Sequence, residues 1–134
     1  MCEKLFNRKL LPISLYCLMF LGACAGNPPP PPAKGSLASK LELNGNIPYL
    51  DVADIRSTRR NGLLVVQVTL GNTGLNSHHF VYRFKWFDRT GFIVGGDEPW
   101  KPLPLYNKQY QSINAVAPSP LVEDFRLVVQ YPDD

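Results

Sequence analysis

Histidines and paired carboxylates are the residues of this 134-residue chain that most readily suggest chemistry. The two histidines, His78 and His79, are adjacent, and adjacent residues on a strand point to opposite faces, so they make a poor metal site. The dipeptide Asp97-Glu98 supplies too few ligands for calcium. The sequence has no nucleophile elbow, zinc-protease motif, phosphate loop or dinucleotide fingerprint. It therefore predicts no catalytic residue, no metal and no cofactor, and we do not expect an enzyme.

A signal peptide precedes the one cysteine that is placed for covalent chemistry. The chain opens with the cationic segment Met1–Lys9 and continues with the apolar run Leu10–Leu21. A helix of that run rises about 18 Å, which is too short for a hydrocarbon core of about 30 Å. A basic start, a short apolar run and small residues after it are typical of a secretory signal. We therefore expect residues 1–23 to be removed.

The tetrapeptide Leu21-Gly22-Ala23-Cys24 resembles a bacterial lipobox. The resemblance implies a diacylglycerol on the Cys24 thiol, cleavage after Ala23 and acylation of the new amine, with palmitate-like chains. Each buried CH₂ contributes roughly 0.8 kcal/mol, so two or three chains form a lasting membrane anchor. Cys24 is the only one of the three cysteines that the mature chain would keep, which excludes an internal disulfide. Since Ala25 rather than Asp follows it, the resemblance implies the periplasmic face of the outer membrane in a Gram-negative host.

Charge and composition after the leader do not favour nucleic acid as a partner. The whole chain has a net charge of +3. The leader holds three of the 14 basic and one of the 11 acidic residues, so residues 24–134 have a net charge of only +1. Residues 24–36 comprise the lipidated cysteine and a tether whose Pro28–Pro32 run favours a stiff polyproline II rod of roughly 15 Å. We interpret this segment as a spacer between membrane and domain.

Residues 37–134 show the period-two alternation of half-buried strands. Four aromatic residues, Phe80, Tyr82, Phe84 and Trp86, alternate for example with Val81, Arg83 and Lys85. The predicted strands cover residues 37–43, 49–56, 64–70, 80–86, 109–116 and 125–131. Turn residues such as Asn61-Gly62 separate them. The pattern predicts an all-β, immunoglobulin-like antiparallel β-sandwich without a disulfide.

The aromatic strand also carries a family resemblance. Asn72-Thr73, the run Val81–Asp88 (VYRFKWFD) and Gly91 resemble the signature of the YcfL-like family of predicted bacterial envelope lipoproteins. Further matches continue the pattern at Trp100, Leu103, Ala115–Pro118 and Asp124–Leu127. The resemblance implies a sandwich fold and an envelope location, and it implies no activity because the function of that family is undefined.

Candidate contact residues are basic or aromatic. A cationic cluster and one face of the aromatic strand are predicted to contact a partner or an anion: Arg56, Arg59, Arg60, Arg83, Lys85 and Trp100. Phe92, Trp100 and Tyr106 lie in loop-rich sequence and suggest an apolar patch, with core packing as the favoured alternative for Trp100. The preferred hypothesis is a lipid-anchored periplasmic interaction or structural module that docks an envelope protein through a sheet face, an edge or its loops. The alternative is a peptidoglycan-binding or purely structural envelope lipoprotein.

Overall fold

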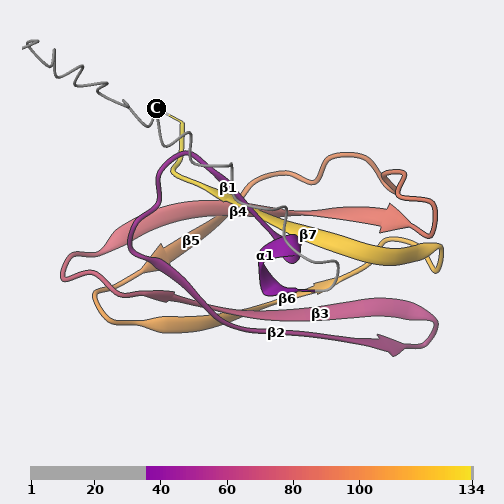
Figure 1. The fold of residues 1–134 in the computed structure, drawn as a ribbon, viewed down its shortest axis with the longest axis horizontal. Helices are drawn as coiled ribbons and strands as arrows, with labels where there is room; N and C mark the ends of the chain where they lie inside the picture. The colour runs from indigo at the N-terminus through magenta and orange to yellow at the C-terminus, as the bar shows by residue number, and fades with distance from the viewer. Residues whose placement is uncertain (1–35, 134) are drawn as a thin grey trace, which may run out of the picture. The chain divides into compact units, whose positions relative to one another are not determined.

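The computed structural model describes residues 36–133 (Figure 1). The predicted signal peptide, the cleavage site at Ala23, the lipid site at Cys24 and the proline tether lie outside these residues. The described elements, in chain order, are α1 (Leu37–Lys40), β1 (Leu41–Asn44), β2 (Leu50–Arg60), β3 (Leu63–Asn72), β4 (His78–Asp88), β5 (Lys101–Leu105), β6 (Tyr110–Val116) and β7 (Val122–Gln130). No helix among residues 36–133 is long and apolar enough to cross a membrane.

The strands form two sheets, one with the order β1-β7-β4-β5 and one with the order β2-β3-β6. Figure 1 shows the two sheets as layers, with the first above the second. Neighbouring strands pair antiparallel except β1, which runs parallel to β7. Cysteine is absent from residues 36–133, so no disulfide links the layers. The predicted all-β sandwich without a disulfide is confirmed.

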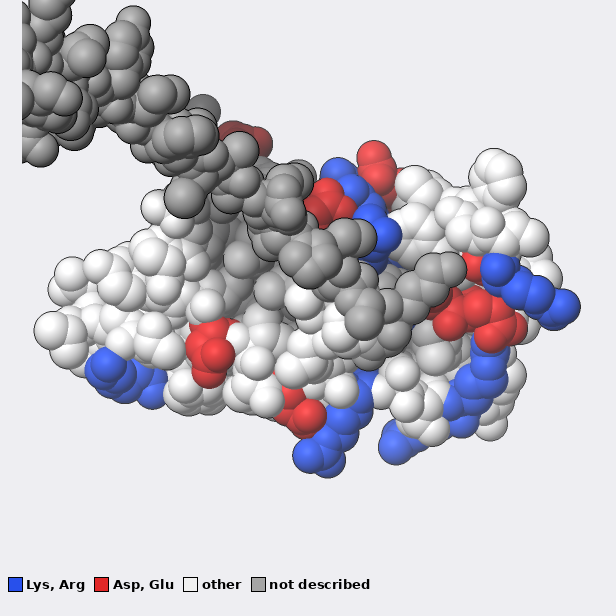
Figure 2. All heavy atoms as spheres, viewed as in Figure 1, with Lys and Arg blue, Asp and Glu red and all other residues white. Residues whose placement is uncertain are grey.

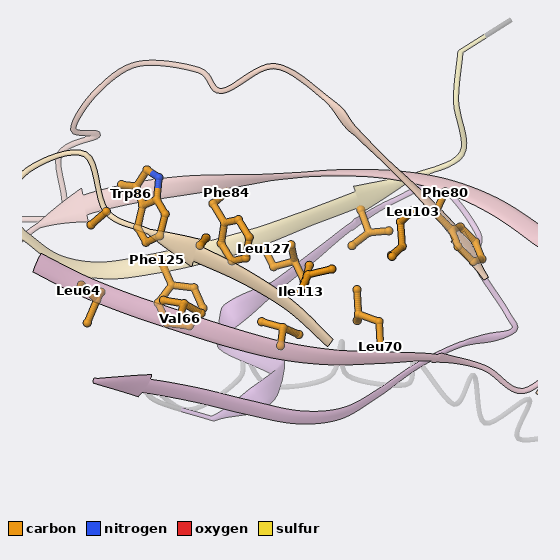
Figure 3. Packing of buried hydrophobic residues seen from close by; sticks show 14 of the residues in the cluster. Leu64, Val66, Leu70, Phe80, Phe84, Trp86, Leu103, Ile113, Phe125 and Leu127 are labelled. Carbon is orange, nitrogen blue, oxygen red and sulfur yellow. The ribbon is translucent and has the colours of Figure 1, made fainter. Parts of the chain in front are cut away.

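The core lies between the two layers, as Figure 3 shows. Phe84 and Trp86 are fully buried, and their rings stack with centroids 5.4 Å apart. Phe125 of β7 packs against Phe84 at 6.2 Å. Val66 and other alternate residues of β3 face them from the second sheet. Full burial of one such side chain contributes roughly 1.5–3 kcal/mol, so this alternating face is what holds the layers together.

Two elements differ from the sequence prediction. The predicted strand 37–43 begins instead with the single-turn helix α1, because the Ser36 side chain caps it by accepting a hydrogen bond from the Ser39 N–H at 3.3 Å. Strand β5 was not predicted, since its sequence KPLPL carries two prolines. Proline lacks the N–H that an inner strand must donate, but β5 is an edge strand, where proline is tolerated.

The predicted Asn61-Gly62 turn is present between β2 and β3. Asn61 has φ 50° and Gly62 has φ 79°. Two consecutive positive φ angles are the requirement of a type I′ hairpin turn, and Asn-Gly meets it with little strain. This turn fixes the register Arg60↔Leu63, which in turn places alternate residues of β3 in the core.

Candidate functional site

Three connections meet at one end of the sandwich, at the left of Figure 1. They are residues 45–49 between β1 and β2, residues 73–77 between β3 and β4, and residues 106–109 between β5 and β6. The second and third come together because β4 begins at His78 and β5 ends at Leu105, and these two residues are register partners. We call this end the loop end.

Asn72, the last residue of β3, ties two of these connections together. It is the buried polar residue of the described chain, with 0% of its surface exposed. Its side-chain amide donates to the carbonyl oxygens of Asn76 (2.7 Å), Leu105 (3.1 Å) and Tyr106 (3.2 Å). Its side-chain oxygen accepts from the Gly74 N–H at 2.9 Å. A buried amide with all its groups satisfied holds both loops in one conformation.

Further contacts attach the remaining connection. The Thr73 N–H donates to the carbonyl oxygen of Tyr49 at 2.9 Å, and the Lys108 ammonium donates to the carbonyl oxygen of Thr73. The Tyr49 ring stacks on the imidazole of His78 with centroids 5.3 Å apart. All three connections are therefore joined by hydrogen bonds or ring contacts.

Large apolar side chains remain exposed on this framework. Leu75 is 79% exposed and Tyr106 is 62% exposed. Tyr49 and Tyr131 are partly exposed and both contact the His78 ring. We call Tyr49, Leu75, His78, Tyr106 and Tyr131 the loop-end surface. On the face in view, Figure 2 shows few charged side chains at this end, whereas most lie toward the other end.

Tyr110 lies beside the loop end, on the outer face of the three-stranded sheet. Its ring crosses Gly71, where a Cβ atom would collide with the ring carbons. Its hydroxyl donates to Asp51 at 3.1 Å. This hydrogen bond and the negative charge of Asp51 raise the pKa of the Tyr110 hydroxyl. The ring thus lies over Gly71, held there by the bond to Asp51, and about half of the residue remains exposed.

The opposite end carries an open depression of about 690 Å³, lined by residues that include Asp88, Arg89 and Asp124. The Asp88 side-chain oxygen accepts from the Thr90 hydroxyl (2.7 Å), the Thr90 N–H (2.8 Å) and the Phe92 N–H (3.0 Å). The Thr90 hydroxyl most of all, and then the backbone N–H groups, lower the pKa of Asp88 against the opposing effect of desolvation. A general acid needs a raised pKa, so Asp88 is suited to holding its turn.

The other carboxylates of this depression have ionic partners. Asp124 forms an ion pair with Lys40, and Glu123 forms one with Arg59 at 2.8 Å. Among the described residues, no three His, Cys, Asp or Glu side chains gather where they could hold a metal ion.

The predicted cationic cluster is divided between two faces of β2. Arg56 forms an ion pair with Asp54 at 2.5 Å. Arg59 instead reaches toward the other sheet, where it donates to the Val122 carbonyl oxygen at 2.8 Å. Arg60 is exposed next to the hairpin turn. Anion contact by these residues stays a prediction, and Arg59 has a structural role that the sequence did not reveal.

The remaining predicted contact residues lie on the outer face of the four-stranded sheet. The Arg83 guanidinium stacks over the Trp100 ring at 4.5 Å and lies 3.6 Å from Asp97. Lys85 donates to Glu42 of β1 at 2.9 Å, so this ion pair bridges the strand between them, β7. Arg83, Lys85 and Trp100 each contact another group of this chain. Partner contact by these three residues stays a prediction.

The apolar patch predicted from Phe92, Trp100 and Tyr106 is wrong. Phe92 lies beside Asp88, the last residue of β4, because the Asp88 N–H donates to the Phe92 carbonyl oxygen at 2.9 Å. Tyr106 instead directly follows Leu105, the register partner of the first residue of β4. An eleven-residue strand spans about 35 Å, so the two rings lie at opposite ends. Sequence proximity to loops could not show this, because both ends of a sandwich carry loops.

Sequence reasoning missed the part that Asn72 and the loop-end tyrosines have in this surface. Asn72-Thr73 entered only as part of a family signature. An asparagine directly after an apolar strand and before a Gly-containing loop was the available signal, since such side chains often satisfy turn backbones. The meeting of Tyr49 with His78 left no signal, because it depends on which loops share an end.

Comparisons with known proteins agree with this fold. A family model described as "Protein of unknown function (DUF1425)" matches residues 46–131. The chain is similar to the crystal structure of cj0090 of Campylobacter jejuni, with 22% identity and a TM-score of 0.60 over 69% of this chain and 98% of that chain. It is similar to a DUF1425 family member from Shewanella sp. pv-4, with 25% identity and a TM-score of 0.57 over 63% of this chain and 80% of that chain. No curated protein matches the sequence.

The Campylobacter likeness concerns the fold alone, since its sequence identity is low. The family match is broader in meaning, because it covers more than half of the chain and includes the aromatic strand, Asn72 and every residue of the loop-end surface. The chain therefore belongs to the DUF1425 family of proteins of unknown function.

Proposed function

We propose that this protein is a lipid-anchored module of the bacterial envelope that docks a protein partner through the loop-end surface. The observation that carries the proposal is the exposure of Leu75 and Tyr106 on loops that a buried amide holds fixed. Interfaces are enriched in tyrosine, and rigid presentation of apolar side chains lowers the entropy cost of binding. The role is binding and not catalysis.

The anchor is proposed from the sequence. Leu21-Gly22-Ala23-Cys24 supports lipidation of Cys24, and the similarity of the aromatic strand to YcfL-like lipoproteins supports an envelope location. In a Gram-negative host, Ala25 supports the periplasmic face of the outer membrane. Intact-mass measurement of the membrane-extracted protein should give a chain that starts at Cys24 and carries acyl groups. Cys24→Ser should leave the chain without lipid, and an unmodified wild-type chain in the membrane fraction would contradict the anchor.

Docking is tested with substitutions that leave the core intact. Leu75→Ser with Tyr106→Ser should lower the amount of protein partner that is recovered with the tagged chain from gently crosslinked envelopes by about tenfold or more, because each removes exposed contact area. The matched control is Phe92→Ser, since Phe92 is 72% exposed but lies at the other end. Equal recovery with both variants would contradict docking at the loop end.

A second candidate is peptidoglycan binding, which one observation favours. The Tyr110 ring lies over Gly71 on the outer sheet face, and the next register pair on that face brings the hydroxyls of Thr69 and Ser112 to 2.9 Å from each other. An aromatic face next to hydroxyl groups suits a sugar ring. Purified peptidoglycan, without other proteins, should then sediment the wild-type chain, and Tyr110→Ala should abolish that. Failure of the wild-type chain to sediment would rule this candidate out.

A further inference from the structure

The two sheets have four edge strands, and three of them carry features that discourage pairing with another strand. β1 has only four residues, and β5 contains Pro102 and Pro104. β2 has a bulge between Val52 and Asp54 and carries several charged side chains. β6 differs from all three. Its seven residues, YQSINAV, contain no charge and no proline, and its register with β3 is continuous.

Among residues 36–133, β6 has a hydrogen-bonded neighbour on one side only, which is β3. The Asn72 N–H donates to the Gln109 carbonyl oxygen, and the Ala117 N–H donates to the Leu64 carbonyl oxygen. The backbone groups of the odd-numbered residues of β6 therefore form the hydrogen bonds to β3. In an antiparallel pair the alternate residues point their backbone groups the other way. The N–H and C=O groups of Tyr110, Ser112, Asn114 and Val116 thus face away from β3.

The same four residues share the outer face of the sheet, because their register partners on β3 are Gly71, Thr69, Gln67 and Val65. Tyr110 is 51% exposed and Val116 is 56% exposed, and they lie at the two ends of the strand. Ser112 and Asn114 lie between them. If a second β6 runs antiparallel with its Ile113 opposite the first Ile113, then Tyr110 faces Val116 and Ser112 faces Asn114.

This register satisfies both the backbone and the side chains. The facing residues are those whose N–H and C=O groups point outward, so each pair can exchange two hydrogen bonds. Ser112 opposite Asn114 can form a side-chain hydrogen bond across the strands, and Val116 lies opposite Tyr110, whose ring stays over Gly71 of its own sheet. No like charges meet, because β6 has none. The strand is therefore complementary to itself about a two-fold axis, which is the symmetry most homodimers use.

We propose that two copies of this chain associate through β6, with Ile113 at the two-fold axis, and that the two three-stranded sheets become one continuous six-stranded sheet. This surface is separate from Leu75 and Tyr106, so self-association and docking can be tested independently. A strand from an unrelated protein at β6 would be a different outcome and would contradict the proposal.

The test is a charge pattern that depends on the register. In Ser112→Lys/Asn114→Lys, both facing pairs become Lys–Lys in the dimer. In Ser112→Lys/Asn114→Glu, both become Lys–Glu. The side chains of Ser112 and Asn114 are exposed in the wild-type chain, so neither double variant disturbs the core. The control is Gln67→Lys, which places the same charge on the same face of the central strand β3. The full chain is measured in detergent micelles by sedimentation velocity over a concentration series, with circular dichroism to verify folding.

The wild-type chain and Gln67→Lys should dimerise alike. The Lys/Lys variant should raise the dimer dissociation constant about tenfold or more, and the Lys/Glu variant should restore it. Mixing the Lys/Lys variant with Ser112→Glu/Asn114→Glu should produce mixed dimers. A wild-type chain that stays monomeric at every concentration, or two double variants that dimerise equally, would overturn the proposal. Leu75→Ser with Tyr106→Ser should dimerise as the wild type does, whether or not docking holds.

Discussion

At the scale of single residues, Asn72 shows how one side chain orders a surface. Its side-chain amide donates to three carbonyl oxygens and accepts from one backbone N–H, from two different loops and the end of β5. Asn72→Ala would leave several of these groups buried and unsatisfied. We expect a loss of about 3 kcal/mol in the free energy of unfolding, measured by urea denaturation.

The control for that substitution is Asn107→Ala, which removes the same amide from an exposed position in the 106–109 connection. Its expected effect is within about 0.5 kcal/mol, as is usual for surface positions. Equal losses in the two variants would mean that the hydrogen bonds of Asn72 do not stabilise the loop end.

The lowered pKa of Asp88 predicts that the free energy of unfolding depends on pH in acid. Its pKa lies below the ordinary value of 3.8 in the folded chain, so its carboxylate stabilises the fold above that pH. The contribution is lost as the pH falls through the lower, folded pKa. Asp88→Asn keeps an acceptor oxygen but cannot titrate, so its urea midpoint should fall less steeply in acid than that of the wild type. Thr90→Ala removes the main cause of the shift and should give an intermediate slope. Parallel curves for all three proteins would contradict this role.

For single residues, the sequence predicted which residue types could bind a partner better than it predicted which groups those residues contact in the fold. It singled out Arg59 as a candidate for binding an anion, and the guanidinium does form an ion pair, but with a carboxylate of this chain. Its partners, Glu123 and the Val122 carbonyl oxygen, belong to a strand more than 60 residues away. Only the packing of the two sheets brings them together, and no local pattern encodes that.

At the scale of elements, β4 and β3 could be predicted because their burial alternates with period two. Phe80, Phe84 and Trp86 are buried as that period requires. Helix α1 could not be predicted, since a four-residue helix depends on one cap at Ser36 and not on a period. Nor could β5, because its prolines are acceptable only at an edge, and the sheet order decides where the edges lie.

The inner face of β4 gives a stability prediction. Phe84→Ala removes a fully buried ring that contacts both Trp86 and Phe125. The free energy of unfolding should fall by about 3–5 kcal/mol, the usual cost of a lost core aromatic. Phe92→Ala removes the same atoms from an exposed loop and should change it by less than about 1 kcal/mol. Similar costs for both, in parallel urea titrations, would mean that the core is not where the alternation places it.

At the scale of the whole molecule, the chain joins a sequence-predicted anchor to a sandwich with distinct ends. One end of the sandwich gathers Tyr49, Leu75, Tyr106 and Tyr131 on loops tied by Asn72. The other end gathers ion pairs and the Asp88 turn, together with the exposed Phe92, Ile93 and Leu121. A sequence can predict that a sandwich has two loop ends. It cannot readily predict which loops share one, because that follows from the strand order. The location of the candidate site was therefore beyond the sequence, although its residue types were in view.

The account rests on docking at the loop end, and site-specific photocrosslinking tests this most directly. A photoreactive amino acid at position 75 or 106 of the full chain, irradiated in intact cells, should give a discrete adduct with one protein. The same amino acid at position 92, which is equally apolar and exposed at the other end, should not give that adduct. An adduct at all three positions alike, or at position 92 alone, would contradict the account.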